Sequence, residues 1–174
     1  DQAIALEKGG ADIIIIETMS AVDEASLAVK AARENTNCTV ILTMTFSKTP
    51  KAEYRTMMGV SPETMVSSMT EAGAHIIGSN CGNGIEDMIG IVKAIRAVNK
   101  RIPVMIQANA GVPELIDGKT VYRESPEIMA KYVPELINAG ANIIGGCCGT
   151  TPEHIKVISE IVSRYNQRKI NQLG

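Results

Sequence analysis

Runs of apolar residues along the chain predict strands that alternate with helices. Three segments share one pattern: GGADIIIIET at 9–18, AGAHIIGSNC at 72–81 and AGANIIGGCC at 139–148. The glycine before each isoleucine run suits a helix end, where a positive φ is common. The isoleucines predict strands buried on both faces of a parallel sheet. Two further strands are predicted at 39–46 and 103–109.

Between these strands, apolar residues recur at helical spacing, which predicts helices. This spacing is clearest at 85–98 and 155–165, where apolar residues recur on one helix face. A hydroxyl residue, a proline and an acid stand in succession at 61–63, 125–127 and 151–153. These residues favour, in that order, the N-cap, the first helical position and the first turn.

Three further segments carry helix signals. Residues 1–8 are typical of the last turns of a helix. The helix after the first strand is expected to start near Ser20, with Asp23 at the capping-box position. Pro134 should kink or shorten the helix expected at 126–138.

The predicted order is therefore one helix followed by five βα units, which implies a parallel sheet with right-handed crossovers. Two architectures fit: a doubly wound sheet, and five-eighths of a (β/α)₈ barrel. The leading helix favours the barrel. A five-stranded part of a barrel should have its strands in sequence order without reversal and all its helices on the convex side. We expect its concave side to carry apolar residues such as Ile14, Ile16, Val104 or Ile106.

Composition narrows the possible partners. The net charge of −2 gives no electrostatic reason to expect DNA, RNA or an anionic membrane as partner. Aromatic residues make up 3% of the chain, too few for base-stacking platforms. No apolar run approaches the roughly 20 residues of a membrane helix, and no signal peptide is visible at residue 1. We therefore expect a cytoplasmic protein.

Unusual polar residues gather at the predicted carboxyl ends of the strands, where active sites form in either architecture. Glu17 closes the first strand, Cys81 the third and Asn109 the fourth, while Cys147 and Cys148 close the fifth. Clustered thiols in such a chain indicate metal binding or catalysis more than a disulfide framework.

Three cysteines at neighbouring strand ends favour Zn²⁺. Cys147 and Cys148 would point to opposite faces of an ideal strand, so sharing one ion requires the bend that Gly145, Gly146 and Gly149 permit. Three protein ligands leave one tetrahedral position open, as in catalytic zinc sites. The alternatives are inert buried thiols, a Cys147–Cys148 disulfide formed after metal loss, and glycines that cradle phosphate.

The remaining cysteine and the histidines are interpreted as structural. Cys38 and His75 lie at the opposite ends of their strands from the predicted site. His154 falls in the first turn of the last helix, where a surface or capping role is expected. Met65 and Met69 have helical spacing and are expected in the core.

Three segments resemble the homocysteine S-methyltransferase family: GSNCG at 78–82, QANAGVPELIDGKTVY at 107–122 and GGCCGTTPEHI at 145–155. Within that family they look most like the homocysteine-binding domain of cobalamin-dependent methionine synthases. The resemblance covers essentially the whole chain. It implies a (β/α)₈ barrel in which residues 1–174 form the C-terminal part of one domain, with strands four to eight.

On that resemblance, Cys81, Cys147 and Cys148 match the zinc ligands of the family. Glu17 matches the acid that binds the amino group of homocysteine. Its alternative role is a favourable interaction with the dipole of the following helix.

The resemblance also assigns asparagines to the site. Asn109 matches an asparagine near the metal, which makes it a candidate fourth ligand when substrate is absent, and a substrate contact. Its alternative role is to shape the turn at 107–113. Asn80 is expected at the substrate site, or else to orient the turn that holds Cys81.

The function implied by the resemblance is zinc-dependent methyl transfer to the thiol of L-homocysteine, which forms methionine. The expected donor is a methylated corrinoid, methylcobalamin, on another domain or subunit, with a methyltetrahydrofolate domain as a further partner. The alternatives are a small-molecule donor (betaine or S-methylmethionine), another thiol acceptor, and a non-catalytic zinc scaffold. The family's first three strands and their Asp-Gly substrate contact are not represented in the 174 residues, so we expect the isolated chain to be inactive.

Overall fold

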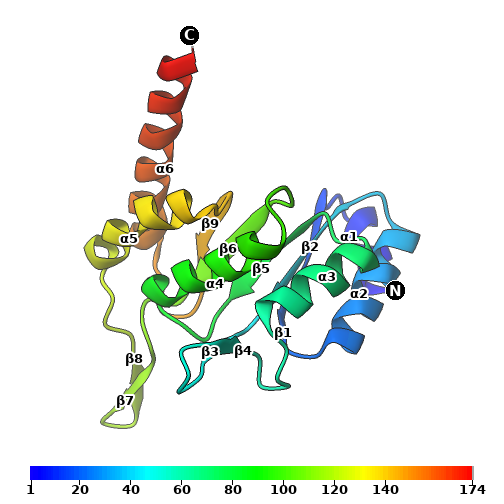
Figure 1. Ribbon diagram of the computed structural model, residues 1–174, viewed down its shortest axis with the longest axis horizontal. Coiled ribbons are helices and arrows are strands. Elements are labelled where there is room, and N and C mark those ends of the chain that lie inside the picture. Colours follow the sequence, from blue (N-terminus) through cyan, green and yellow to red (C-terminus); the bar gives the residue numbers. More distant parts are fainter. Residues whose placement is uncertain (174) are drawn as a thin grey trace.

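A computed structural model describes residues 1–173, in which one parallel sheet is lined with helices (Figure 1). The helices and the main-sheet strands are α1 (Gln2–Lys8), β1 (Ile13–Met19), α2 (Val22–Asn35), β2 (Thr39–Met44), α3 (Pro62–Ala72), β5 (Ile76–Asn80), α4 (Ile85–Val98), β6 (Val104–Ala108), α5 (Pro126–Ala139), β9 (Ile143–Gly146) and α6 (Pro152–Leu173). Two short hairpins complete the described chain: β3 (Ser47–Lys48) with β4 (Tyr54–Arg55), and β7 (Glu114–Ile116) with β8 (Lys119–Val121).

The main sheet has the strand order β1-β2-β5-β6-β9, and each neighbouring pair is parallel. This order follows the sequence and has no reversal, whereas a doubly wound sheet requires one. Each helix packs against the next one, from α1 through to α6, as expected of helices that share one face of the sheet. The fold is therefore a partial (β/α)₈ barrel, as predicted, and the doubly wound alternative is wrong.

The hydrophobic core lies between the sheet and the helices. Alternate strand positions pack into it, among them Ile14, Ile16, Val104 and Ile106. The other positions face away from the helices, and in the outer strands Ile13, Ile15 and Ile143 are 49%, 45% and 39% exposed. The prediction that the first set lines the concave side is therefore wrong. Neighbouring strand residues face opposite sides of the sheet. The helices cover the side that carries Ile14, Ile16, Val104 and Ile106, so these residues lie on the convex side.

Burial differs between the central and the outer strands. Among the three isoleucine-run strands, every residue of β5 after Ile76 is buried, so the prediction of burial on both faces is confirmed there. In β1 only Ile14 is buried, and β9 has no buried residue. The prediction is wrong for these outer strands because their concave faces are open.

Local signals set several helix ends. Ser61 caps α3 by accepting a hydrogen bond from the Thr64 N–H at 3.2 Å, and Gly73 ends it with φ 94°. The helix α2 begins later than predicted, with Ala21 rather than Ser20 as its N-cap and no side-chain capping bond. The helix α5 continues through Pro134 without interruption, so the proline does not shorten it.

The helix α6 starts where predicted but is longer, with 22 residues. Figure 1 shows its C-terminal half projecting beyond the neighbouring α5. Polar residues intersperse its apolar positions, and among the described helices none has the length and apolar character needed to cross a bilayer.

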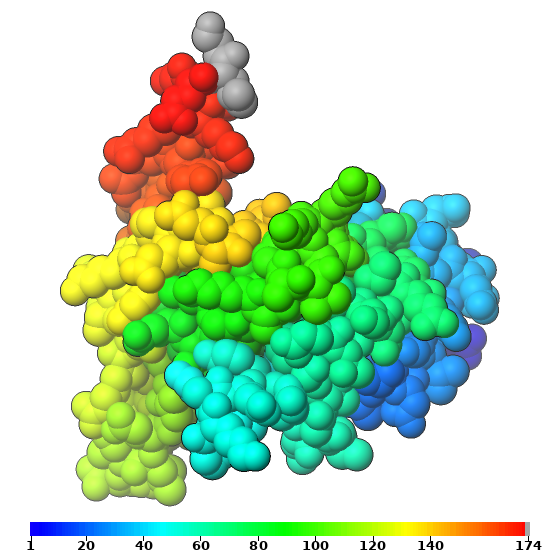
Figure 2. Space-filling model, viewed as in Figure 1, coloured from blue at the N-terminus to red at the C-terminus, as the bar shows by residue number. Residues whose placement is uncertain are grey.

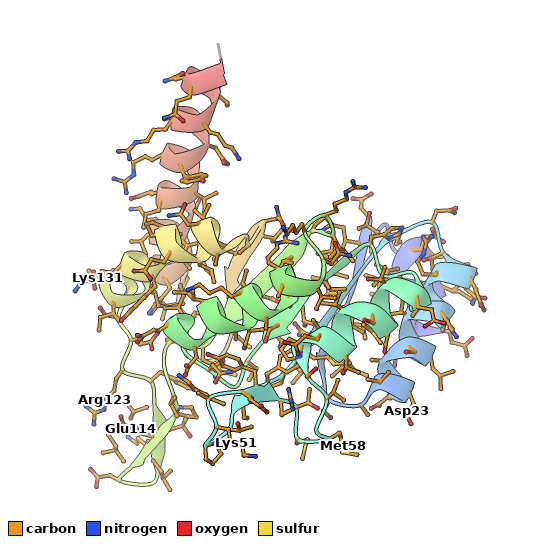
Figure 3. All side chains as sticks on the ribbon, viewed as in Figure 1. Asp23, Lys51, Met58, Glu114, Arg123 and Lys131 are labelled. Carbon is orange, nitrogen blue, oxygen red and sulfur yellow. The ribbon has the colours of Figure 1, made fainter. Side chains whose placement is uncertain are left out.

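The hairpin of β7 and β8 was not predicted, although the sequence contains its signal. Asp117 and Gly118 have φ values of 50° and 75°, as an Asp-Gly pair does in a two-residue hairpin turn. The Arg123 Nε lies 2.7 Å from the Glu114 carboxylate across the base of this hairpin (Figure 3). Figure 2 shows the hairpin projecting from the body of the molecule.

Candidate metal centre

Three thiol groups converge where β5 and β9 end. The Sγ atom of Cys148 lies 3.8 Å from that of Cys81 and 3.9 Å from that of Cys147. All three Sγ atoms lie within 4.8 Å of one another. Tetrahedral zinc with Zn–S bonds of about 2.3 Å holds its sulfur ligands about 3.8 Å apart, whereas a disulfide bond measures about 2.05 Å. The spacing of these free cysteines therefore fits one shared metal ion.

The intervening strand β6 holds the backbone at both sides of the cluster. The Cys81 N–H donates to the Gln107 carbonyl at 3.1 Å, and the Cys147 N–H donates to the Ala108 carbonyl at 2.7 Å. Cys81 itself has φ 59°, which turns the chain sharply after β5. Two strand ends separated by a third strand are thus brought to one point.

The chain bends at the vicinal cysteines, as predicted. Gly149 has φ 78°, a conformation that favours glycine. The Cys148 N–H donates to the side-chain oxygen of Asn109 at 3.1 Å, and the Cys148 carbonyl accepts from the Ala110 N–H at 2.9 Å. The Asn109 side chain, which is 2% exposed, therefore positions one of the thiols.

Burial and neighbouring charge oppose the ionisation of Cys147. Burial raises the pKa of Cys147 to about 11, and charges on Cys81 and Cys148 act in the same direction, while a backbone hydrogen bond from Cys148 opposes them. A divalent cation reverses this balance because it favours the thiolate form of every ligand. The donor set is suited to a soft divalent ion.

Glu17 lies on β1, at the same edge of the sheet as the thiols. By alternation it shares the open face with the exposed Ile13 and Ile15, and its side chain is exposed. The acids in the first turn of α2 are Asp23 and Glu24, so Glu17 precedes that helix and is no part of its first turn.

Asn80 is 1% exposed. Its side chain is hydrogen-bonded to Thr18 and Thr43 on the two preceding strands of the sheet. This geometry matches the alternative expectation for Asn80, which is that it orients the turn that holds the next residue, Cys81.

Tyr122 is a site residue that sequence reasoning missed. Its ring packs on the backbone of Gly149, where an added Cβ would lie 2.2 Å from the ring. Burial raises the pKa of Tyr122, and the charge of Cys148 raises it further. Two signals could have identified it: the Asp-Gly turn predicts a hairpin, and Tyr122 ends the motif at 107–122.

Glu124 and His154 tie the base of the hairpin to the helices that follow the cysteines. The Glu124 carboxylate accepts from the Ile85 N–H, at the start of α4, at 3.4 Å. Burial raises the pKa of Glu124, and that hydrogen bond opposes the shift. The His154 Nδ1 accepts from the Thr151 N–H at 3.0 Å, which leaves its Nε2 to donate to the Glu124 carbonyl at 2.9 Å. His154 is 5% exposed, so its predicted capping role is confirmed and a surface position is wrong.

The remaining candidates lie at the amino-terminal edge of the sheet and have backbone partners. The Cys38 thiol donates to the Ala11 carbonyl at 3.1 Å, and the His75 Nδ1 accepts from the Val40 N–H at 2.9 Å. Both are structural, as predicted. Met65 and Met69 are fully buried in the core, also as predicted.

Fold and thiol cluster together define an α/β-barrel protein with a candidate three-thiolate metal centre at the carboxyl ends of its strands. Residues 1–162 match the family described as homocysteine S-methyltransferase. The chain therefore belongs to the homocysteine S-methyltransferase family, and the resemblance found in its motifs is confirmed.

Individual relatives agree with this assignment. The chain is 28% identical over 168 residues to methionine synthase from Mycobacterium leprae, which covers 95% of this chain and 14% of that protein. The homocysteine methyltransferase MmuM from Escherichia coli, in its oxidized form, has a similar fold, with a TM-score of 0.70 and 22% identity over 90% of this chain and 47% of that one. The carboxyl transferase domain of Rhizobium etli pyruvate carboxylase shares only the fold, with a TM-score of 0.56 and 18% identity over 92% of this chain and 30% of that one. The chain thus spans less than half of each of these relatives.

Proposed function

We propose that residues 1–174 form the C-terminal part of one barrel domain that methylates the thiol of L-homocysteine to give methionine. The observation that carries the proposal is the convergence of three free thiols, with Sγ separations of 3.8 and 3.9 Å, at the carboxyl ends of the strands. Membership of the homocysteine S-methyltransferase family supports the thiol acceptor.

Cys81, Cys147 and Cys148 would hold Zn²⁺. When bound, the ion would supply a Lewis acid that favours the thiolate form of an incoming thiol near neutral pH. The carbonyls of β6 and the Asn109 side chain fix the backbone of these ligands. Asn109 is also our candidate for the fourth ligand in the absence of substrate, because its buried oxygen lies beside Cys148 and has a second lone pair.

Glu17 would bind the ammonium group of homocysteine. Its exposed carboxylate on the open face of β1, before the first turn of α2, supports this role over an interaction with the helix dipole. In the reaction, a bond forms between the homocysteine sulfur and the methyl carbon. The bond between methyl group and donor breaks, its electron pair stays with the donor, and the thiol proton passes to solvent.

The proposed donor is methylcobalamin on another domain or subunit, with a methyltetrahydrofolate domain as a further partner. The similarity to a methionine synthase supports this choice. A small-molecule donor such as betaine or S-methylmethionine is the alternative, because the fold is equally that of MmuM. We place the reaction in the cytoplasm, where reducing conditions keep three neighbouring thiols free.

X-ray absorption at the zinc edge tests the proposal on the full natural protein. We expect three sulfur ligands and one light ligand without substrate, and four sulfur ligands after addition of L-homocysteine. A shell that stays unchanged would favour the non-catalytic zinc scaffold, and a protein that binds no zinc would overturn the proposal. The open concave face leads us to expect that the isolated chain binds zinc without turnover.

A further inference from the structure

The residue before Cys81, Asn80, has a buried side chain that bonds the strand that carries Glu17. The Asn80 side-chain oxygen accepts from the Thr18 N–H at 2.8 Å and from the Thr43 hydroxyl at 2.7 Å. Its amide nitrogen donates to the Thr18 hydroxyl at 2.7 Å. Three adjacent strands, β1, β2 and β5, are thus joined at their carboxyl ends.

Both ends of this connection have an unusual backbone conformation. Thr18 has φ 63° and Cys81 has φ 59°. A positive φ is a genuine outlier for a β-branched residue such as threonine, and it persists only where the surroundings hold it. Asn80 bonds both the backbone N–H and the hydroxyl of Thr18, and these bonds are the restraint.

The residue that Asn80 restrains, Thr18, directly follows Glu17 on β1. The register between β1 and β2 shifts between Ile16 and Met19, the interval that contains Glu17 and Thr18. Bulges of this kind redirect side chains next to functional sites. Asn80 therefore holds, from β5, the irregular backbone that adjoins Glu17.

We propose that Asn80 is a positioning residue that sets the separation between the Glu17 carboxylate and the Cys81 thiol, and so selects amino thiols by chain length. The inference rests on the proposed function, in which Glu17 binds the ammonium group and the metal centre binds the sulfur. Homocysteine has one methylene more than cysteine between its amino-bearing carbon and its sulfur. With both ends held, only one of these lengths lets both groups bind at once.

Substitutions in the full natural protein test the inference, with the ratio of cysteine to homocysteine dissociation constants as the readout. Loss of one methylene in a fitted site changes affinity by about 10- to 200-fold, so we expect a large ratio in the wild type. We expect Asn80→Ala to lower it by about 10-fold while zinc content stays stoichiometric. Thr18→Val, on an exposed residue, removes the hydroxyl and should lower the ratio in the same direction without disturbing the core.

A rescue and a control separate positioning from general destabilisation. Glycine tolerates positive φ, so the double variant Asn80→Ala with Thr18→Gly should recover part of the ratio without refilling the space left by Asn80. The matched control is Asn142→Ala. The Asn142 side-chain oxygen also accepts two hydrogen bonds, from the Val104 N–H at 2.9 Å and from the Arg96 guanidinium at 2.7 Å, but at the opposite edge of the sheet. Asn142→Ala should leave the ratio of the cysteine and homocysteine dissociation constants unchanged.

The two proposals fail in different ways. A wild type that binds no zinc or no homocysteine overturns the proposed function. A wild type that binds both, with an unchanged ratio in folded, zinc-loaded Asn80→Ala and Thr18→Val, overturns the role of Asn80 alone. If Asn80→Ala does not fold, Thr18→Val decides: a lowered ratio supports the inference and an unchanged one refutes it.

Discussion

The two edges of the sheet contain the same residue types and use them differently. At the amino-terminal edge, Cys38 and His75 each have a backbone hydrogen-bond partner. At the carboxyl-terminal edge, the sulfur atoms of Cys81 and Cys148 face each other, and backbone amides around them are held by neighbouring strands. Thiols therefore mark a site only where local backbone groups leave the sulfur atoms free. Parallel strands produce that asymmetry because the chain turns and bends after their carboxyl ends.

The largest expected effect is on zinc content, which should differ between cysteine variants at the two edges of the sheet. Alanine at Cys81, Cys147 or Cys148 should abolish stoichiometric zinc binding, because two thiolates form an incomplete site. Cys38→Ala should keep full zinc content. Metal analysis of the purified full protein measures both outcomes, and normal zinc in any one of the first three variants would remove that residue from the ligand set.

The next effect separates substrate binding from metal binding along β1. Glu17→Gln should weaken homocysteine binding by about 10- to 1000-fold, since a charged hydrogen-bond partner is lost, with zinc content unchanged. Asp12→Asn, an exposed acid just before the other end of the strand, is the matched control and should leave the dissociation constant as it is. An unaffected dissociation constant in Glu17→Gln would point to a role outside the substrate site.

A smaller effect concerns the hairpin that reaches the thiol cluster. Tyr122→Phe keeps the ring on Gly149 but removes the hydroxyl beside Cys148. Loss of a polar group that supports a metal ligand typically weakens metal binding by about 10- to 100-fold, which competition with a chelator measures. Tyr132→Phe, whose hydroxyl bonds Glu86 on a neighbouring helix, should change zinc affinity little. Equal zinc affinities in the two variants would show that the Tyr122 hydroxyl has no influence on the centre.

The smallest effect belongs to the amino-terminal edge. Asn142→Ala removes two hydrogen bonds from an exposed side chain, so we expect the free energy of unfolding to fall by about 1 kcal/mol. Zinc content should not change. Denaturant unfolding with parallel metal analysis measures both, and a loss of zinc would break the proposed separation between the two edges.

Local patterns in the sequence were enough for the five strands of the main sheet, several helix ends and the cluster of three cysteines. Gly73 and Gly140 end their helices with positive φ, as the repeated motif predicted. The three clustered cysteines and Glu17 are expected at strand ends because each lies at or next to the end of a segment that contains an isoleucine run. Such features depend on residues within one or two turns of each other, and the sequence contains them in full.

Contacts between distant segments decided the rest. Strand alternation states that Ile13 and Ile14 face opposite sides, but only the packed helices decide which of the two is buried. Asn80 was singled out by its motif, yet its partner Thr18 is 62 positions away, and no local pattern connects them. Tyr122 follows the β7–β8 hairpin and packs on Gly149, while the nearby Glu124 bonds the start of α4. These choices are made by burial and hydrogen bonding across the sheet, and they place the thiols, the acid and the tyrosine at one end of the barrel.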